Sequence, residues 1–100
     1  MYARVSTYEG TSESVERSLA QGDELVPLVR GMQGSRGLLL LVDRDRGREV
    51  TITLWEDEDA MRASERAADR LRRDSAASAG QTIASVDRYE VALLDLSRPS

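Results

Sequence analysis

The chain has 100 residues, of which 40% are hydrophobic and 32% are charged, and its formal net charge is −4. A chain of this length and composition is typical of one globular domain, so we expect a single domain over residues 1–100. The acidic balance, with arginines and acids interspersed, leaves no basic stripe for phosphates and excludes a typical nucleic-acid-binding protein.

Several residue types that carry chemistry are missing. There is no cysteine and no histidine, which removes disulfides, thiolate nucleophiles, the commonest general base and the commonest metal ligand. There is also no lysine, so all 14 cationic residues are arginines and no Schiff base can form on a lysine. We therefore expect no metal and no bound cofactor. A chain without Lys, Asn or Phe also indicates a GC-rich bacterial genome.

The first predicted element is a strand over residues 2–8, where Tyr, Val and Thr alternate with small and polar residues. A helix follows, with Ser12 or Thr11 as its N-cap, and Pro27 is expected to kink or break it near residues 22–23. Apolar residues at three- and four-residue steps give this helix one buried face, made of Val15, Leu19, Gly22, Leu25, Val26, Leu28, Val29 and Met32.

Three glycines, Gly31, Gly34 and Gly37, end this helix. A phosphate-binding loop would follow a strand and open a helix, whereas these glycines follow a helix and precede a strand. Helix-ending and turn glycines are therefore favoured over a phosphate site.

The next two strands are predicted to form a hairpin around a charged, solvated turn at Gly47. Residues 38–43 are apolar on consecutive positions, which indicates a strand covered on both faces. Residues 50–55 alternate strictly and place Thr51, Thr53 and Trp55 on one face of the sheet.

Trp55, the only tryptophan, is followed at once by four acidic residues. We interpret these acids as the first turn of a helix from Asp57 to about Ser75, whose narrow apolar face includes Met61, Ala68 and Leu71. They are less well explained as a metal site, because side chains diverge around a helix and no histidine assists.

The same helix carries Arg70, Arg72 and Arg73 near its expected end, where they would complement the helix dipole. After it we expect a loop over residues 76–81, and then a long final strand over residues 82–96. This strand is expected to be irregular near Ser85, and residues 97–100 are expected to form a frayed end.

The predicted order is strand, helix, strand, strand, helix, strand. This is the α+β, ferredoxin-like βαββαβ fold, a four-stranded antiparallel sheet with two helices on one face. The other face would carry apolar residues from 38–42 and 91–96, a patch larger than monomers usually expose. A second copy of the chain is the simplest cover, so we expect a homodimer.

The stretch GSRGLLLLVDRDRGREVTITLWEDEDAMRASE, residues 34–65, resembles the antibiotic biosynthesis monooxygenase (ABM) domain, a dimeric α/β-barrel fold. The resembling features are the glycine turn, a Gly-led apolar strand, a hairpin, a strand that ends in Trp and an acid, and an Ala-rich helix. With the flanking elements the resemblance covers roughly residues 2–95.

The resemblance implies a pocket between the sheet and the helices, lined by the residue that corresponds to Trp55, with Thr53 and Thr51 as further substrate-binding candidates. It does not favour haem degradation. Haem-degrading members use a His on the following helix, where this chain has Glu65 nearby, and an Asn on the first strand, near Ser6 or Thr7. Some monooxygenase members use the same Asn, and this chain contains none.

The leading functional hypothesis is therefore a cofactor-independent monooxygenase acting on a small aromatic or polyketide-like substrate. A Trp suits stacking on a flat ring, an inward Arg or Tyr hydroxyl would hold an oxyanion, and a buried Glu or Asp would act as base. The alternative is a non-catalytic dimeric module that binds a small hydrophobic ligand or serves a structural role.

Several residues keep two interpretations. Trp55 either lines a pocket or plugs the end of the core. Arg4 and Arg88, which interrupt strands, either point into a cavity or form interfacial ion pairs, with Glu90 or with an acid of a partner chain. Tyr2, Tyr8 and Tyr89 are interpreted as packing residues at a sheet edge or interface rather than as catalytic phenols. No run approaches a membrane span and the first residues hold no signal-peptide stretch, so we expect a cytoplasmic protein without a membrane partner.

Overall fold

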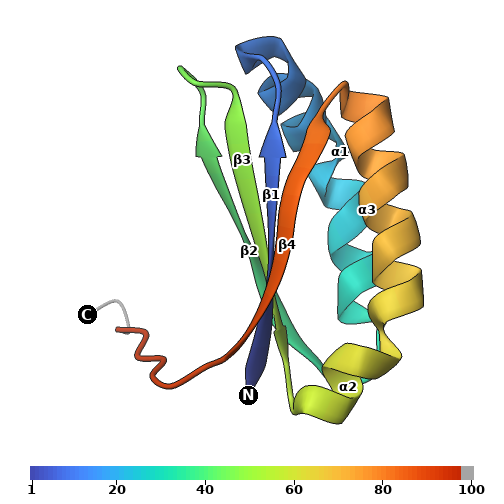
Figure 1. Cartoon of the computed structure of the whole chain (residues 1–100), viewed down its shortest axis with the longest axis vertical. Helices are drawn as coiled ribbons and strands as arrows, with labels where there is room; N and C mark the ends of the chain where they lie inside the picture. Colours follow the sequence, from blue (N-terminus) through green and yellow to red (C-terminus); the bar gives the residue numbers. More distant parts are fainter. Residues whose placement is uncertain (98–100) are drawn as a thin grey trace.

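The structure is a computed structural model and describes residues 1–97. Its strands are β1 (Tyr2–Glu9), β2 (Ser35–Asp43), β3 (Arg48–Trp55) and β4 (Thr82–Glu90), and its helices are α1 (Ser12–Arg30), α2 (Glu58–Ala63) and α3 (Glu65–Ala79). The strands form one antiparallel sheet in the order β2-β3-β1-β4, and the helices lie on one face of it (Figure 1). The predicted ferredoxin-like fold is confirmed.

Thr11, one of the two predicted N-caps, is the residue that caps helix α1. The Ser14 N–H donates to Thr11 Oγ1 at 3.1 Å and the Thr11 N–H donates to Ser14 Oγ at 2.9 Å, so each side chain satisfies a backbone group of the other. Of the kink or break expected near residues 22–23, the break is wrong, because the helix continues to Arg30 with Pro27 inside it. Pro27 lies in the last turn, so its missing N–H removes one helical hydrogen bond close to the helix end. The carbonyls of the last turn have no helical partner in any case.

The second predicted helix begins as expected, with the Asp57 carboxylate accepting from the Ala60 N–H at 2.8 Å. It is not one helix, however, because it is interrupted at Ser64, whose Oγ donates to the Met61 carbonyl at 2.7 Å. The second part, α3, runs to Ala79 and ends at Gly80 in the left-handed conformation, with φ 76°. The loop expected over residues 76–81 is therefore mostly helix, because Ala and Ser provide no stop signal before the glycine.

Strand β4 ends at Glu90, so the prediction that it continues to residue 96 is wrong. Its partner β1 begins at Tyr2, and beyond that point the described residues add one backbone hydrogen bond, from the Val91 N–H to the Met1 carbonyl at 2.9 Å. The predicted irregularity is confirmed, because the pairing of β1 with β4 shifts register beside Ser85. Of the expected frayed end, residues 98–100 lie outside the described residues.

The face of the sheet away from the helices is open within one chain. Leu39 and Leu41 of the edge strand β2 are 44% and 48% exposed, and Tyr89 of the opposite edge strand β4 is 55% exposed. The expectation that residues 38–42 are covered on both faces is thus not met by this chain alone. On α1, Leu28 is exposed rather than part of the buried face.

Candidate functional site

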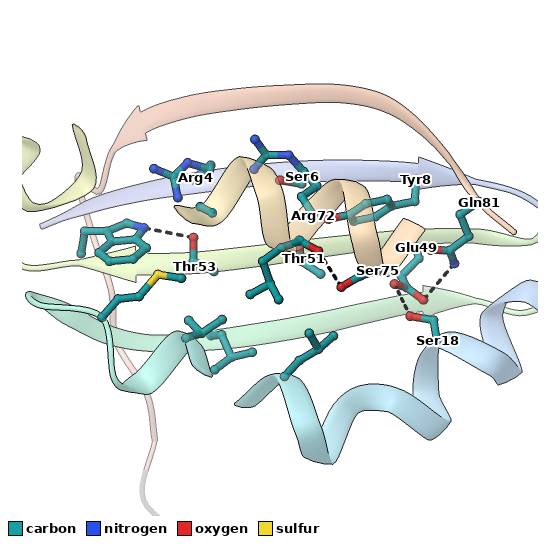
Figure 2. Close-up of a pocket in the computed structure, with 17 residues that line it drawn as sticks. Arg4, Ser6, Tyr8, Ser18, Glu49, Thr51, Thr53, Arg72, Ser75 and Gln81 are labelled. Atoms are coloured by element: carbon teal, nitrogen blue, oxygen red, sulfur yellow. Dashed lines mark hydrogen bonds between the residues drawn. The ribbon is translucent and has the colours of Figure 1, made fainter. Parts of the chain in front are cut away.

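A cavity of about 100 Å³ lies between the sheet and the helices α1 and α3 (Figure 2). Its apolar lining comes from Leu25, Val29, Met32, Leu38, Trp55, Ala68 and Leu71, and its polar lining from Arg4, Ser6, Tyr8, Ser18, Glu49, Thr51, Thr53, Arg72, Ser75 and Gln81. Figure 2 shows Thr53 and Arg4 toward one end of this cavity and Ser18, Glu49 and Gln81 at the other.

The period of a strand explains how β1 and β3 supply the floor of the cavity. Side chains two residues apart share a face, so Arg4, Ser6 and Tyr8 of β1 point the same way. On β3 the same rule brings Glu49, Thr51, Thr53 and Trp55 to the cavity. The two sets lie side by side, because Arg4 pairs with Thr53, Ser6 with Thr51 and Tyr8 with Glu49.

The three predicted substrate-binding residues all lie on this floor. Trp55 is 1% exposed, and its Nε1 donates to Thr53 Oγ1 at 3.0 Å. The guanidinium carbon of Arg4 lies 5.3 Å from the centroid of the Trp55 ring, which is the geometry of a cation–π contact. The indole is thus fixed from two sides while it borders the cavity.

Arg4 is the predicted arginine that does enter the cavity. It is 2% exposed, and its Nη2 donates to the Met61 carbonyl at 2.8 Å, to Ser64 Oγ at 3.0 Å and to Glu65 Oε1 at 2.9 Å. Arg88 does not line the cavity. It donates from the surface to both oxygens of Glu65 at 2.6 Å.

These contacts explain the electrostatics of the Arg4 end. The paired hydrogen bonds from Arg88, together with that from Arg4, lower the pKa of Glu65 to about 2. Burial lowers the pKa of Arg4, which means that holding its charge away from water costs free energy. Glu65 is therefore a carboxylate that offsets this cost.

Arg72 is a cavity residue that the sequence analysis placed wrongly at a helix end. Helix α3 continues beyond it to Ala79, and Arg72 is only 8% exposed. Its spacing of four from both Ala68 and Ala76 was the available signal, because such residues share one face of a helix. That face is the buried one.

The two cavity arginines keep free hydrogen-bond donors. Among the residues that the structure describes, Nε and Nη1 of Arg4 and Nε of Arg72 are buried and have no hydrogen-bond partner. Buried donors without partners are rare in native proteins and cost free energy. An acceptor in the cavity would satisfy them.

Glu49, at the other end, was also missed. It is 3% exposed, and it accepts from Ser18 Oγ at 2.7 Å and from Gln81 Nε2 at 3.3 Å. The alternation of β3 was expected to begin at residue 50, but it extends one residue further back and includes Glu49. Beside it, burial raises the pKa of the Tyr8 phenol, so this group is a neutral hydroxyl rather than a phenolate.

The acidic residues that follow Trp55 cap helix α2 or form ion pairs at the surface. Asp57 caps the helix, and Glu56 accepts from Arg36 Nη2 at 3.1 Å. Within residues 1–97, no three carboxylates are grouped so that they would hold a metal ion. In the same range, no helix combines the length and apolar character needed to cross a membrane.

Solved structures with this arrangement of sheet and helices identify the fold. A Deinococcus radiodurans protein assigned to the antibiotic biosynthesis monooxygenases superposes with a TM-score of 0.73 at 15% identity, over 99% of this chain and 100% of that one. This chain has the ABM fold. The resemblance stated from the sequence is confirmed at that level, although no protein-family model matches the chain.

Two further structures show what ABM folds do elsewhere. A variant of SnoaB, a cofactor-independent oxygenase from Streptomyces nogalater, superposes with a TM-score of 0.71 at 18% identity, over 93% of this chain and 94% of that one. MhuD, a heme-degrader from Mycobacterium tuberculosis with two hemes in its active site, superposes with a TM-score of 0.70 at 20% identity, over 97% of this chain and 100% of that one. At such identities the likeness shows the fold alone.

Closer relatives by sequence are two uncharacterized proteins of M. tuberculosis. Rv2558 is 39% identical over 100% of this chain, and Rv2557 is 36% identical over 94% of it. The match spans only 42% of the length of each relative. Both relatives are therefore much longer than the ABM-fold chain described here.

Proposed function

We propose that the chain is a cofactor-independent monooxygenase that acts on a small phenolic aromatic or polyketide-like substrate in the cavity beside Trp55. One observation carries this proposal: Arg4 lines the cavity, is stacked on the Trp55 ring, and keeps two buried nitrogens, Nε and Nη1, without hydrogen-bond partners. A flat ring bound against the indole would bring its oxygen to those donors. SnoaB, which shares the fold, is an oxygenase without a cofactor.

In this proposal the reaction begins with loss of a proton from an activated CH₂ or phenol of the substrate. The charged N–H groups of Arg4 stabilise the oxyanion that results, which lowers the pKa of the substrate and favours its ionisation. We assign the role of base to Glu49, the buried carboxylate of the cavity, whose oxygens retain acceptor capacity beyond the bonds from Ser18 and Gln81.

The anion then reacts with O₂, which is the oxidant. One electron passes to O₂, the resulting radicals combine to a peroxide, and loss of water leaves a carbonyl. The balance is R₂CH₂ + O₂ → R₂C=O + H₂O. The protein contributes a dry, positively charged site that orients the ring and stabilises the anion.

The size of the cavity limits the substrate. An engineered cavity of about 150 Å³ binds benzene, so the cavity of about 100 Å³ in this chain has room for roughly one aromatic ring. A larger substrate requires the flexible side chains of Met32 and Leu25 to move outward. We therefore propose a substrate with one ring inside the cavity.

Haem, which MhuD binds, does not fit the residues of this cavity. The chain has no histidine or cysteine to coordinate iron. The volume of about 100 Å³ is also well below the roughly 300–1,000 Å³ of pockets that hold drug-sized ligands. Haem degradation is therefore not proposed for this chain.

We also propose that the chain forms a homodimer through the open face of its sheet. Leu39 and Leu41 lie there on one edge strand and Tyr89 lies on the other, all largely exposed. An apolar face of this kind is usually covered in the native assembly. The identical face of a second copy would cover it.

The monooxygenase is tested by oxygen uptake with a one-ring phenol and with anthrone, with and without protein. Acceleration over the spontaneous rate is expected, together with saturable quenching of Trp55 fluorescence. In Trp55→Phe, which has no tryptophan left to quench, the acceleration and the affinity measured by titration calorimetry should both weaken at least several-fold while the protein still folds. The control Tyr89→Phe should match the wild type.

Two other outcomes separate the alternatives. Saturable binding without any acceleration would remove the monooxygenase and leave the non-catalytic binding module. No quenching, together with a loss of about 3–5 kcal/mol of stability in Trp55→Ala, would show that the indole only fills the core.

A further inference from the structure

The cavity contains a second buried cation that the proposed reaction does not use. Arg72 comes from α3, on the wall opposite the sheet, and Figure 2 shows it near Ser6, between Arg4 and Tyr8 along the cavity. Its Nη2 contacts a single carboxylate, Asp69, at 3.3 Å. That carboxylate is shared with the exposed Arg73, which lies closer to it at 2.9 Å.

The neighbours of Arg72 leave its Nε free. Ser75 Oγ donates to the Leu71 carbonyl, and the oxygens of Glu49 are bonded to Ser18 and Gln81. No described residue accepts a bond from Nε of Arg72, although this atom is fully buried. Arg72 therefore lines the cavity with a buried N–H donor that no described residue satisfies.

The charges around the cavity also favour an incoming anion. Arg4 and Arg72 are both less than a tenth exposed and face the same space, and Glu49 is the one carboxylate among the lining residues. Glu65 balances Arg4 from outside the lining, but Arg72 has only the shared Asp69. An anion beside Arg72 would relieve the repulsion between the two guanidinium groups.

We propose that the substrate is an aromatic carboxylic acid whose carboxylate binds Arg72 while its ring lies against Trp55. This inference rests on the proposed function for the position of the ring, and it adds the class of substrate. A carboxylate is planar and matches the fork of a guanidinium, which holds it by charge-assisted bonds. It is also small enough to share a one-ring cavity with the ring that carries it.

Benzoate and benzamide are a matched pair of probes, because they have the same shape and differ in charge. Titration calorimetry and Trp55 fluorescence at pH 7 should show benzoate binding at least about tenfold tighter, equivalent to about 1.4 kcal/mol. Arg72→Gln should abolish this preference while retaining weak binding of benzamide. Arg73→Gln, the neighbouring exposed arginine that shares Asp69, should keep the preference.

Thermal unfolding of each variant identifies loss of folding. If Arg72→Gln does not fold, Arg72→Lys keeps the charge but lacks Nε, and it should reduce the preference to a few-fold. Equal affinity of the wild type for the two probes, or a preference that survives both substitutions, would overturn the inference.

The outcomes also separate this inference from the proposed function. Benzoate binding that depends on Arg72, without oxygen uptake on hydroxylated benzoates, leaves the acid site standing and removes the monooxygenase. Oxygen uptake on neutral phenols that is unchanged in Arg72→Gln leaves the monooxygenase and removes the acid site. Binding of neither probe removes both.

Discussion

Glu65 holds two arginines that would otherwise repel each other. Arg4 and Arg88 are directly paired on the neighbouring strands β1 and β4, and like charges at such positions destabilise a sheet. The Glu65 carboxylate accepts from both guanidinium groups and reaches them from the start of α3. It therefore positions Arg4 over the ring of Trp55 without touching the cavity itself.

Glu65→Gln should destabilise the fold and loosen this arrangement. The substitution keeps the shape of the side chain but leaves the buried Arg4 without its counter-charge. Because Glu65 is partly exposed, we expect a loss of about 1–3 kcal/mol, less than for a fully buried pair. Urea unfolding measures it. Glu58→Gln removes the exposed pair with Arg62 and should cost well under about 1 kcal/mol; equal losses in the two variants would contradict the assignment.

The lowered pKa of Glu65 predicts how the stability of the fold depends on pH. Glu65 has a pKa of about 2 in the folded chain, below its ordinary value of 4.5. Its contribution is therefore fully present above pH 4.5 and is lost as the pH falls toward about 2. The stability difference between wild type and Glu65→Gln should be constant from pH 7 to roughly pH 5 and shrink below that. A difference that stays constant down to pH 2.5 would contradict this prediction.

At the scale of the elements, the turn before β2 is fastened to the end of β3. The Glu56 N–H donates to the Gly34 carbonyl at 2.8 Å, and Gly34 has a φ of 79°. A Cβ at this position would collide with the Cβ of Ala60 in α2. The glycine turn predicted from sequence is therefore required both by backbone conformation and by close packing.

Gly34→Ala should accordingly destabilise the chain by about 2 kcal/mol or more, from left-handed strain together with the collision. Gly22→Ala is the control, because Gly22 lies inside α1 and a Cβ there meets nothing within 4 Å. That variant should be stabilised by up to about 1 kcal/mol. Thermal unfolding of the two variants should thus shift in opposite directions, and a shared direction would contradict the packing argument.

Local sequence patterns were sufficient to predict most of the strands and helices and some of the residues that line the cavity. Strict alternation placed Thr51, Thr53 and Trp55 on one face of the sheet. The same rule adds Glu49 to that face once the strand begins at residue 48 instead of residue 50. The interruption at Ser64 was not predictable, because it depends on contacts with Arg4, a residue 60 positions away. Arg72 was misplaced because the helix end was expected too early; its spacing of four from Ala68 and Ala76 indicates the buried face only once the helix is extended to Ala79.

At the scale of the molecule, the open face of the sheet predicts the oligomeric state. Light scattering after size exclusion at micromolar concentration should give twice the chain mass of 11.1 kDa. The unfolding midpoint should rise with protein concentration, because folding and association are linked. A well-folded monomer would contradict the proposal.

Matched substitutions locate the interface. Leu39→Arg places a charge on the open face and should give monomers or loss of folding. Leu28→Arg, at an exposed position on α1, is the control and should leave the dimer unchanged. Dissociation by the control variant would instead place the interface on the helices.

Because the positive groups of the cavity are arginines, the groups proposed to bind an aromatic acid do not lose their charge when the pH changes. Guanidinium groups stay protonated in proteins, unlike histidine or lysine side chains in comparable sites. Over the range in which the chain stays folded, binding of the proposed aromatic acid should therefore follow the ionisation of that acid. Aromatic acids of different strength should lose affinity at different pH values, each near its own pKa, and a common midpoint for all of them would instead indicate a titrating group of the protein.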